Sequence, residues 1–119
     1  GLIADYFTAW RNQSVDTVRS IFTNDAVLDE KPGIERPLHG KEAITQYWVD
    51  HPLQQKNIFV NVEQVAYGPN LAMCMFGGNF NTPKQHIDIQ GAFYFYIDSH
   101  TQKIERLVQQ FTTNKTPHV

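Results

Sequence analysis

Long apolar runs, basic clusters and cysteine pairs are all missing from this chain of 119 residues. Its one cysteine, Cys74, excludes an internal disulfide and fits a reducing compartment, so we expect a cytoplasmic protein. No apolar run approaches the roughly 20 residues that span a bilayer. The net charge is −2 and Lys and Arg form no block. Neither nucleic acid nor a membrane is therefore an expected partner.

Patterns typical of metal and nucleophile chemistry are missing too. The five histidines show no paired helical spacing of the kind that binds zinc. His86 and Asp88 share a strand face and form either an acid–base pair or two metal ligands, but two ligands alone make a poor zinc site. No serine or cysteine nucleophile motif and no phosphate-binding glycine loop occurs. We therefore expect no metal and no cofactor.

The residues that are present suit a single globular domain spanning residues 1–119. Hydrophobic residues make up 41% of the chain and aromatic residues 13%. This is enough for a core and for the walls of an apolar pocket. The chain starts at Gly1 within a helical pattern, which indicates a tag remnant or a trimmed N-terminus and leaves open a lost targeting segment.

Helical patterns occupy the first part of the chain. Apolar residues recur at three- and four-residue spacing in residues 2–13 and predict an amphipathic helix. Ser14 is a suitable N-cap for a second helix, whose inward residues run to Phe22. A third helix is predicted at residues 41–51, where Pro52 ends it.

Strand-like alternation dominates the rest of the chain. A short strand, Ala26–Glu30, precedes a loop kept irregular by prolines. Four further strands are predicted at residues 58–67, 71–80, 86–98 and 103–113. Gly68-Pro69-Asn70 is a hairpin turn between the first two of these. The pattern predicts an α+β domain in which three N-terminal helices pack on one face of a curved, mainly antiparallel sheet.

The acidic pair at the end of the short strand is the most informative local feature. By alternation, Ala26, Leu28 and Glu30 share one face, while Val27 and Asp29 share the other. If the apolar face packs beneath the helices, Glu30 enters a cavity and Asp29 turns away. A carboxylate in such a cavity is poorly solvated, which raises its pKa.

Both candidate polar residues also have a plain structural interpretation. Glu30 is either a cavity acid or a solvated acid paired with Lys31 or Arg36. Tyr6 lies on the inward stripe of the first helix, where its hydroxyl needs a partner. That partner is Glu30, a ligand or water in a functional site, and a backbone carbonyl in an ordinary core.

The long strand from residue 86 carries large side chains on both faces. Its segment Phe93–Ile97 alternates phenylalanine with tyrosine, so Tyr94 and Tyr96 face away from the helices. A sheet that is apolar on both faces is usually covered on both. We expect a homodimer through this outer face, unless the tyrosines tolerate partial exposure.

The order of the predicted helices and strands, and the sequence motifs in the first half of the chain, resemble those of the nuclear transport factor two-like superfamily. The shared pattern is an aromatic pair in the first helix, the run IFTNDAVLDE, a proline loop, HGKEAI and YW. The closest branch is that of the SnoaL-like polyketide cyclases and ketosteroid isomerases, which implies a cone-shaped fold. The family hosts isomerases, cyclases, dehydratases, hydrolases, ligand carriers and association domains, so the fold does not define the reaction.

The resemblance implies roles for particular residues. Glu30 corresponds to the carboxylate general base, and Tyr6 to the tyrosine that donates to the developing oxyanion. Phe111 corresponds to an aromatic side chain that lines the pocket. The second acid of the oxyanion site belongs on the long strand, but Gly91–Phe93 contains no acid. The other expected ligand contacts are Trp10, Trp48 and Phe93, although the tryptophans equally suit core packing.

Three functions fit these features. The first is a cofactor-independent enzyme that acts on a hydrophobic carbonyl, enol or epoxide, with Glu30 as base and Tyr6 as donor. Asp29, His86 and Asp88 are reserve acid–base residues if the strand phase differs. The second is a noncatalytic protein that binds a hydrophobic small molecule, and the third is an association module that uses the outer sheet face.

Overall fold

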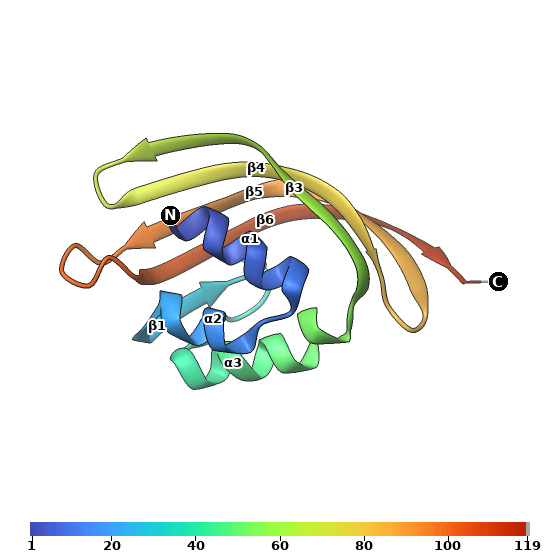
Figure 1. The fold of residues 1–119 in the computed structure, drawn as a ribbon, viewed down its shortest axis with the longest axis horizontal. Helices are drawn as coiled ribbons and strands as arrows, with labels where there is room; N and C mark the ends of the chain where they lie inside the picture. The colour runs from blue at the N-terminus through green and yellow to red at the C-terminus, as the bar shows by residue number, and fades with distance from the viewer. Residues whose placement is uncertain (119) are drawn as a thin grey trace.

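The structure is a computed structural model that describes residues 1–118 and confirms the predicted α+β architecture. The helices are α1 (Leu2–Asn12), α2 (Val15–Ile21) and α3 (Lys41–Asp50), and a short 3-10 helix, Pro52–Gln54, follows α3. The strands are β1 (Phe22–Asp29), β2 (Leu38–His39), β3 (Lys56–Gly68), β4 (Leu71–Asn81), β5 (Gln85–Ile97) and β6 (Ile104–Pro117). Figure 1 shows the long strands arching over the three helices.

Local sequence explains where the helices begin and end. Gln13 adopts a left-handed conformation (φ 55°) that closes α1. Ser14 caps α2, because its side chain accepts a hydrogen bond from the Thr17 amide. His51 ends α3 and Pro52 opens the 3-10 turn. These boundaries agree with the sequence, except that Phe22 begins β1 instead of continuing α2.

The sheet is mixed, and its topology goes beyond the sequence prediction. The strand order is β2-β1-β6-β5-β4-β3, and β1 runs parallel to β6 while all other neighbours are antiparallel. The prediction missed β2, which has only two residues, and the parallel pairing of β1. Local alternation cannot reveal a partner strand about eighty residues away in the chain. Gly68-Pro69-Asn70 forms the predicted hairpin turn, with Asn70 at φ 54°.

Two glycines let the sheet bend around the helices. A Cβ atom on Gly91 would lie 2.1 Å from the Gln110 carbonyl oxygen, and one on Gly78 would lie 1.9 Å from that of Phe59. Gly78 also has φ 155°. Only glycine fits such close approaches of neighbouring strands. Gly78 and Gly91 thus mark the places where β4 and β5 pass closest to their neighbouring strands.

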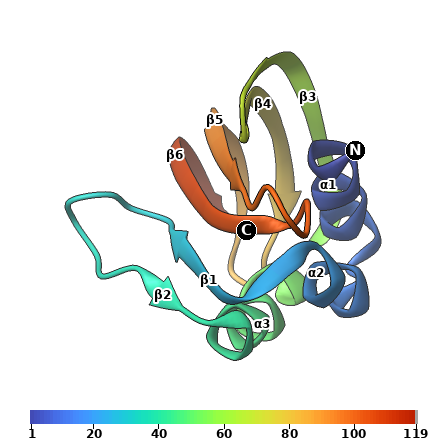
Figure 2. The ribbon, with the colours of Figure 1, turned by 90° about the vertical axis from the view of Figure 1, so that its left-hand side faces the viewer.

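The face of the sheet that contacts the helices, called here the inner face, carries the core. Leu28 on β1, Phe76 on β4, Phe93 and Phe95 on β5, and Leu107 on β6 are all buried there. Burying a large apolar side chain contributes about 1.5–3 kcal/mol each. Figure 2 shows the helices grouped on this side, with the loop between β1 and β2 projecting away from them.

The opposite, outer face carries the side chains of alternate residues. Tyr94 is half-buried and Tyr96 is 39% exposed, so both point away from the helices as predicted. Cross-strand register places Met73, Tyr94 and Val108 in one row across β4, β5 and β6.

Within residues 1–118 no helix is long and apolar enough to cross a membrane.

Candidate functional site

A cavity of about 750 Å³ lies between the inner sheet face and the helices. Its size falls in the range of small-molecule sites. Its walls are contributed by α1, the loop after β1, α3 and the inner faces of β5 and β6. Six of the site residues predicted from the sequence border this cavity: Tyr6, Trp10, Glu30, Trp48, Phe93 and Phe111.

Tyr6 is buried beneath the helices and has a protein partner that the sequence did not reveal. The Gln109 side-chain amide donates a hydrogen bond of 2.7 Å to the Tyr6 hydroxyl oxygen. The proton of the hydroxyl is therefore free to donate to another acceptor. Burial raises the pKa of Tyr6 well above its ordinary value, although the Gln109 hydrogen bond lowers it in part. Tyr6 is thus a neutral donor at the wall of the cavity.

The Tyr6 ring is held by aromatic contacts on several sides. Its ring centroid lies 5.4 Å from that of Trp48 and 5.6 Å from those of Phe93 and Phe95, all in edge-to-face geometry. Such contacts contribute about 0.5–1.5 kcal/mol beyond burial. The hydroxyl position is therefore fixed before any ligand binds, as an efficient hydrogen-bond donor requires.

Glu30 is half-buried just beyond the end of β1 and faces the cavity. The buried neighbours Ala26 and Leu28 confirm the predicted phase of the strand. The alternative ion pair of Glu30 with Lys31 or Arg36 is not found among the described residues, and Lys31 pairs with Glu35 at 3.2 Å instead.

Tyr47 of α3 is a second phenol at the cavity wall, next to Glu30. Burial raises the pKa of Tyr47, and the negative charge of Glu30 and a side-chain hydrogen bond to it raise this pKa further. The carboxylate therefore faces a neutral phenol on the helix side. Tyr47 also packs against His51, with ring centroids 5.0 Å apart.

The two tryptophans differ in their hydrogen bonding. Trp10 donates from Nε1 to the Gln55 side-chain oxygen at 2.7 Å. Trp48 is 1% exposed, and its Nε1 has no partner within the described residues. An unsatisfied buried donor costs about 1–3 kcal/mol. Both side chains pack in the core and also border the cavity.

The reserve acid–base residues lie outside this cavity. Asp29 shares the outer face with Val108, is 7% exposed and pairs with Arg106 at 3.2 Å. It turns away from the helices as predicted, and it is nearly buried. His86 and Asp88 alternate with the buried Ile87 and therefore also face outward, with 3.6 Å between His86 Nε2 and Asp88 Oδ1. These residues were reserve acid–base candidates only for the opposite strand phase, in which their side chains would face the helices.

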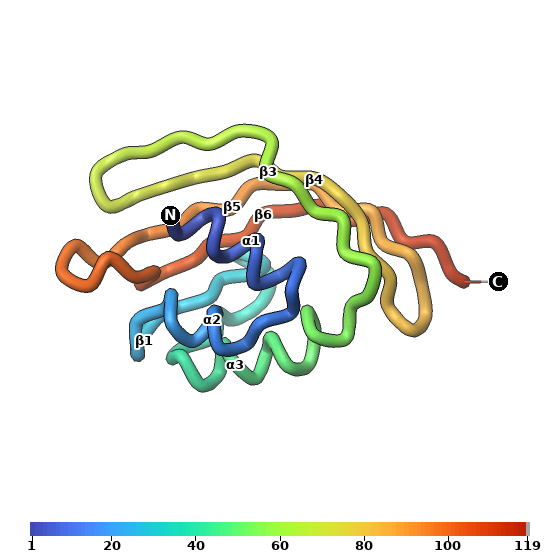
Figure 3. Tube along the Cα trace, viewed as in Figure 1, coloured from blue at the N-terminus to red at the C-terminus, as the bar shows by residue number. Residues whose placement is uncertain are grey.

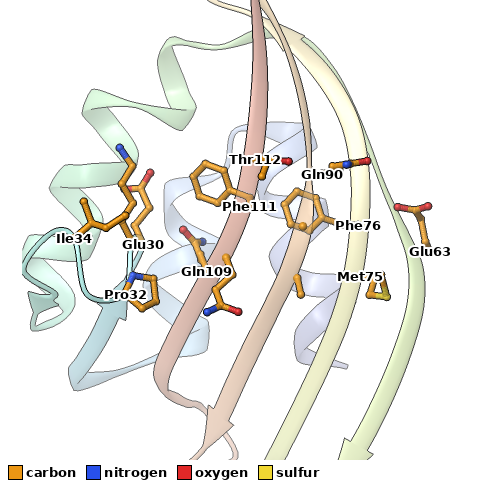
Figure 4. A pocket seen from close by; sticks show the side chains of 14 residues that line it. Glu30, Pro32, Ile34, Glu63, Met75, Phe76, Gln90, Gln109, Phe111 and Thr112 are labelled. Carbon is orange, nitrogen blue, oxygen red and sulfur yellow. The ribbon is translucent and has the colours of Figure 1, made fainter.

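A second hollow of about 680 Å³ extends across the sheet beside the loop after β1. Figure 4 shows Glu30, Pro32 and Ile34 at one side of this hollow and Met75 and Glu63 at the other. Ile34 is 82% exposed and Met75 is 46% exposed. This hollow is open, whereas the cavity beneath the helices is bounded by the core.

The sequence did not identify two polar residues of the cavity wall, Gln109 and Tyr47. Gln109 alternates in phase with Phe111 on β6, and this phase was the one available signal for it. Tyr47 was predicted to face inward, but only as a packing residue.

No group of three or more metal-binding side chains occurs in residues 1–118.

Comparison with known proteins identifies the family. The model of the SnoaL-like domain matches residues 3–107. The chain belongs to the SnoaL-like domain family. Its fold is that of the nuclear transport factor two-like superfamily, as the resemblance implied. No curated protein sequence matches this SnoaL-like domain.

Solved structures share the fold at low sequence identity. RV0760c from Mycobacterium tuberculosis is 12% identical, with a TM-score of 0.82 over 95% of this chain and 93% of that chain. An LEH-like epoxide hydrolase from M. tuberculosis is 12% identical, with a TM-score of 0.78 over 93% of this chain and 80% of that chain. A computationally designed 17-OHP binder is 13% identical, with a TM-score of 0.76 over 95% of this chain and 93% of that chain. At these identities the likeness establishes the fold alone.

Proposed function

We propose that this SnoaL-like domain binds a hydrophobic small molecule in the cavity beneath its helices and performs cofactor-independent acid–base chemistry on it. The observation that carries the proposal is that Glu30 and Tyr6 border one cavity with apolar walls. Glu30 supplies a proton acceptor, and Tyr6 supplies a donor whose own oxygen is already held by Gln109. A base and a donor at one cavity are the groups that isomerisation or cyclisation through an enolate needs.

In the proposed reaction, Glu30 takes a proton from a carbon next to a carbonyl group. The electron pair of the broken C–H bond moves into the carbonyl, and negative charge develops on its oxygen. Tyr6 donates a hydrogen bond to that oxygen. Because the Gln109 amide donates to the Tyr6 oxygen, it makes the phenol a stronger donor. An epoxide substrate uses the same two groups, with Glu30 activating a water and Tyr6 donating to the opening oxygen.

Noncatalytic ligand binding is the alternative, and a specific observation favours it. The strand segment Gly91–Phe93 offers no acid as a second donor to an oxyanion. One phenol is enough to hold a carbonyl group of a bound ligand, whereas proton transfer from carbon usually needs stronger stabilisation of the oxyanion. The designed 17-OHP binder with this fold illustrates that the same architecture suits plain binding.

A ligand screen followed by product analysis tests both functions. Hydrophobic carbonyl, enol and epoxide compounds are screened for binding, and each binder is then incubated with wild-type protein and with Glu30→Gln. Turnover by the wild type that Glu30→Gln abolishes, with binding retained, supports the enzyme. Binding without any product supports the alternative. No binding by any apolar compound contradicts both.

We also propose that the outer sheet face joins two copies of the chain. Met75, Tyr96 and the half-buried Tyr94 form an apolar surface there, which supports this proposal. Light scattering should give a dimer mass for the wild type and a lower mass for Tyr96→Glu, while Tyr67→Glu on the exposed β3–β4 hairpin is the control. A monomer at all concentrations contradicts the homodimer.

The buried free thiol of Cys74 supports a reducing compartment such as the cytoplasm.

A further inference from the structure

The inner-face side chains of β5 and β6 change in character from the middle of the sheet to its end. Paired positions along this direction are Phe93 with Gln109, Gly91 with Phe111, Ile89 with Thr113, and Ile87 with Lys115. All of these residues except Gly91 border the cavity. The β5 row stays apolar, whereas the β6 row changes from an amide to a phenyl ring, a hydroxyl and finally an ammonium group.

This row is long enough to accommodate an extended molecule. Gln109 and Lys115 are six positions apart in the same strand, which corresponds to about 20 Å. The start of β5, the end of β6 and the β4–β5 hairpin reach beyond the helices, on the right in Figure 1, and Figure 3 shows the same extension. The end at Lys115 is therefore the mouth of the cavity, and the end at Gln109 and Tyr6 is its interior.

Positive charge at the mouth is concentrated on the strand side. Lys84 and Lys115 are exposed, border the cavity, and pair with no carboxylate in the part of the chain that the structure describes. They lie at the same end of the sheet, because Lys115 pairs with Ile87 at the start of β5 and the His118 amide bonds to the Lys84 carbonyl oxygen.

The acidic groups that border the cavity are engaged elsewhere or lie further inside. The carboxylate of Glu35 pairs with Lys31 at 3.2 Å, and that of Asp50 accepts from the Gln46 amide at 3.0 Å. Glu30 follows the Asp29–Val108 pair and therefore lies beside Gln109 in the interior.

We propose that the cavity takes an elongated amphipathic molecule whose anionic end group, a carboxylate or a phosphate monoester, binds at Lys115 and Lys84. Its apolar body lies along Ile87, Ile89 and Phe111, and its other end reaches Tyr6. The orientation is fixed, because the Glu30 carboxylate in the interior repels an anion while the lysines at the mouth attract one. This inference rests on the proposed function, since it concerns the ligand of the same cavity.

The test compares dodecanoate, dodecyl phosphate and dodecan-1-ol, which share a chain and differ in the charge of the end group. Dissociation constants are measured by tryptophan fluorescence, below the concentrations at which the probes form micelles. We expect both anions to bind about fivefold more tightly than the alcohol at low salt, which is the size of effect expected for a partly exposed ion pair. The preference should vanish near 1 M salt, where the Debye length is about 3 Å.

Three variants separate this inference from the proposed function. Lys115→Gln and Lys84→Gln should each reduce the preference for the anions and leave alcohol binding unchanged. Lys103→Gln, at the opposite end of the β5–β6 pair, is the matched control and should keep the full preference. Equal affinity of the wild type for all three probes overturns the anionic end group but leaves the apolar cavity intact. Failure of all three probes to bind contradicts the cavity function itself.

Discussion

Two neighbouring carboxylates lie on opposite faces of the sheet and have different environments. Asp29 lies on the outer face, nearly buried, with Arg106 as its partner. Glu30, the next residue, enters the cavity of the inner face beside the phenol of Tyr47. Asp29 is paired with a cation, whereas Glu30 has only the neutral phenol of Tyr47 beside it. The comparison teaches that strand alternation alone can place one acid in an ion pair on the outer face and its neighbour at the wall of the inner cavity.

The sharpest way to break this comparison is to neutralise each acid in turn. Glu30→Gln should lower the turnover of an identified substrate by about 10²–10⁴-fold, because it removes the proton acceptor. Asp29→Asn should leave turnover within a few-fold of wild type, since its carboxylate faces away from the cavity. Steady-state kinetics on both variants measures the difference. Equal losses in the two variants would show that the faces are not functionally distinct.

Removal of the cation tests the structural role of the outer acid. Arg106→Gln should lower the free energy of unfolding by about 2–3 kcal/mol, because it leaves a buried charge without a partner. The expected value is below that of a fully buried pair, since the Arg106 side chain is 46% exposed. Urea denaturation gives the free energy of unfolding, and Glu105→Gln, an exposed neighbour, is the control. A loss no larger than that of the control contradicts the assigned role.

The variant Tyr6→Phe tests the hydrogen bond from the Gln109 amide to the Tyr6 hydroxyl on the inner face. This variant keeps the aromatic packing but leaves the buried Gln109 amide without its acceptor, so we expect a loss of about 2 kcal/mol in unfolding free energy. Tyr96→Phe on the outer face should change this free energy by less than about 0.5 kcal/mol. If both variants have wild-type stability, the contact between Tyr6 and Gln109 does not stabilise the fold.

The stability of the fold at alkaline pH tests the burial of Tyr6 and Tyr47 on the same face. The fold raises the pKa of Tyr6 and Tyr47, whereas tyrosines of the unfolded chain ionise near pH 10. Above that pH the unfolded state binds fewer protons than the folded state, so stability must fall as pH rises. Each tyrosine contributes about 1.4 kcal/mol for each pH unit. Tyr6→Phe should make the fall less steep, and an unchanged slope would contradict the burial of its hydroxyl.

The sequence predicted most of the architecture because local patterns specify it. The inward stripe of α1, the cap at Ser14 and the alternation of residues 26–30 all depend on neighbours within a few positions. The parallel pairing of β1 with β6 and the contact of Gln109 with Tyr6 were missed, because each joins parts of the chain far apart in sequence. The burial of Asp29 was missed for the same reason, since its partner Arg106 lies on another strand.

The candidate site was predicted in part. Tyr6 and Glu30 border one cavity, together with all four expected ligand contacts, because each lies on a face whose phase the sequence reveals. The polar neighbours of the two residues were not predicted. A glutamine on β6 and a tyrosine on α3 are common surface and core residues, and only the folded arrangement brings them to the cavity.

The most direct test of the central claim uses the two tryptophans, which are the chain's only ones and both border the inner cavity. Their indole N–H groups give two separate signals in a nitrogen–proton correlation spectrum, and a ligand such as dodecanoate is added stepwise. We predict that both indole signals shift and saturate together, while amide signals of the outer-face residues Tyr94 and Met75 stay in place. Saturable binding that shifts the outer-face signals and leaves both indoles unchanged would contradict the claim that the inner cavity is the functional site.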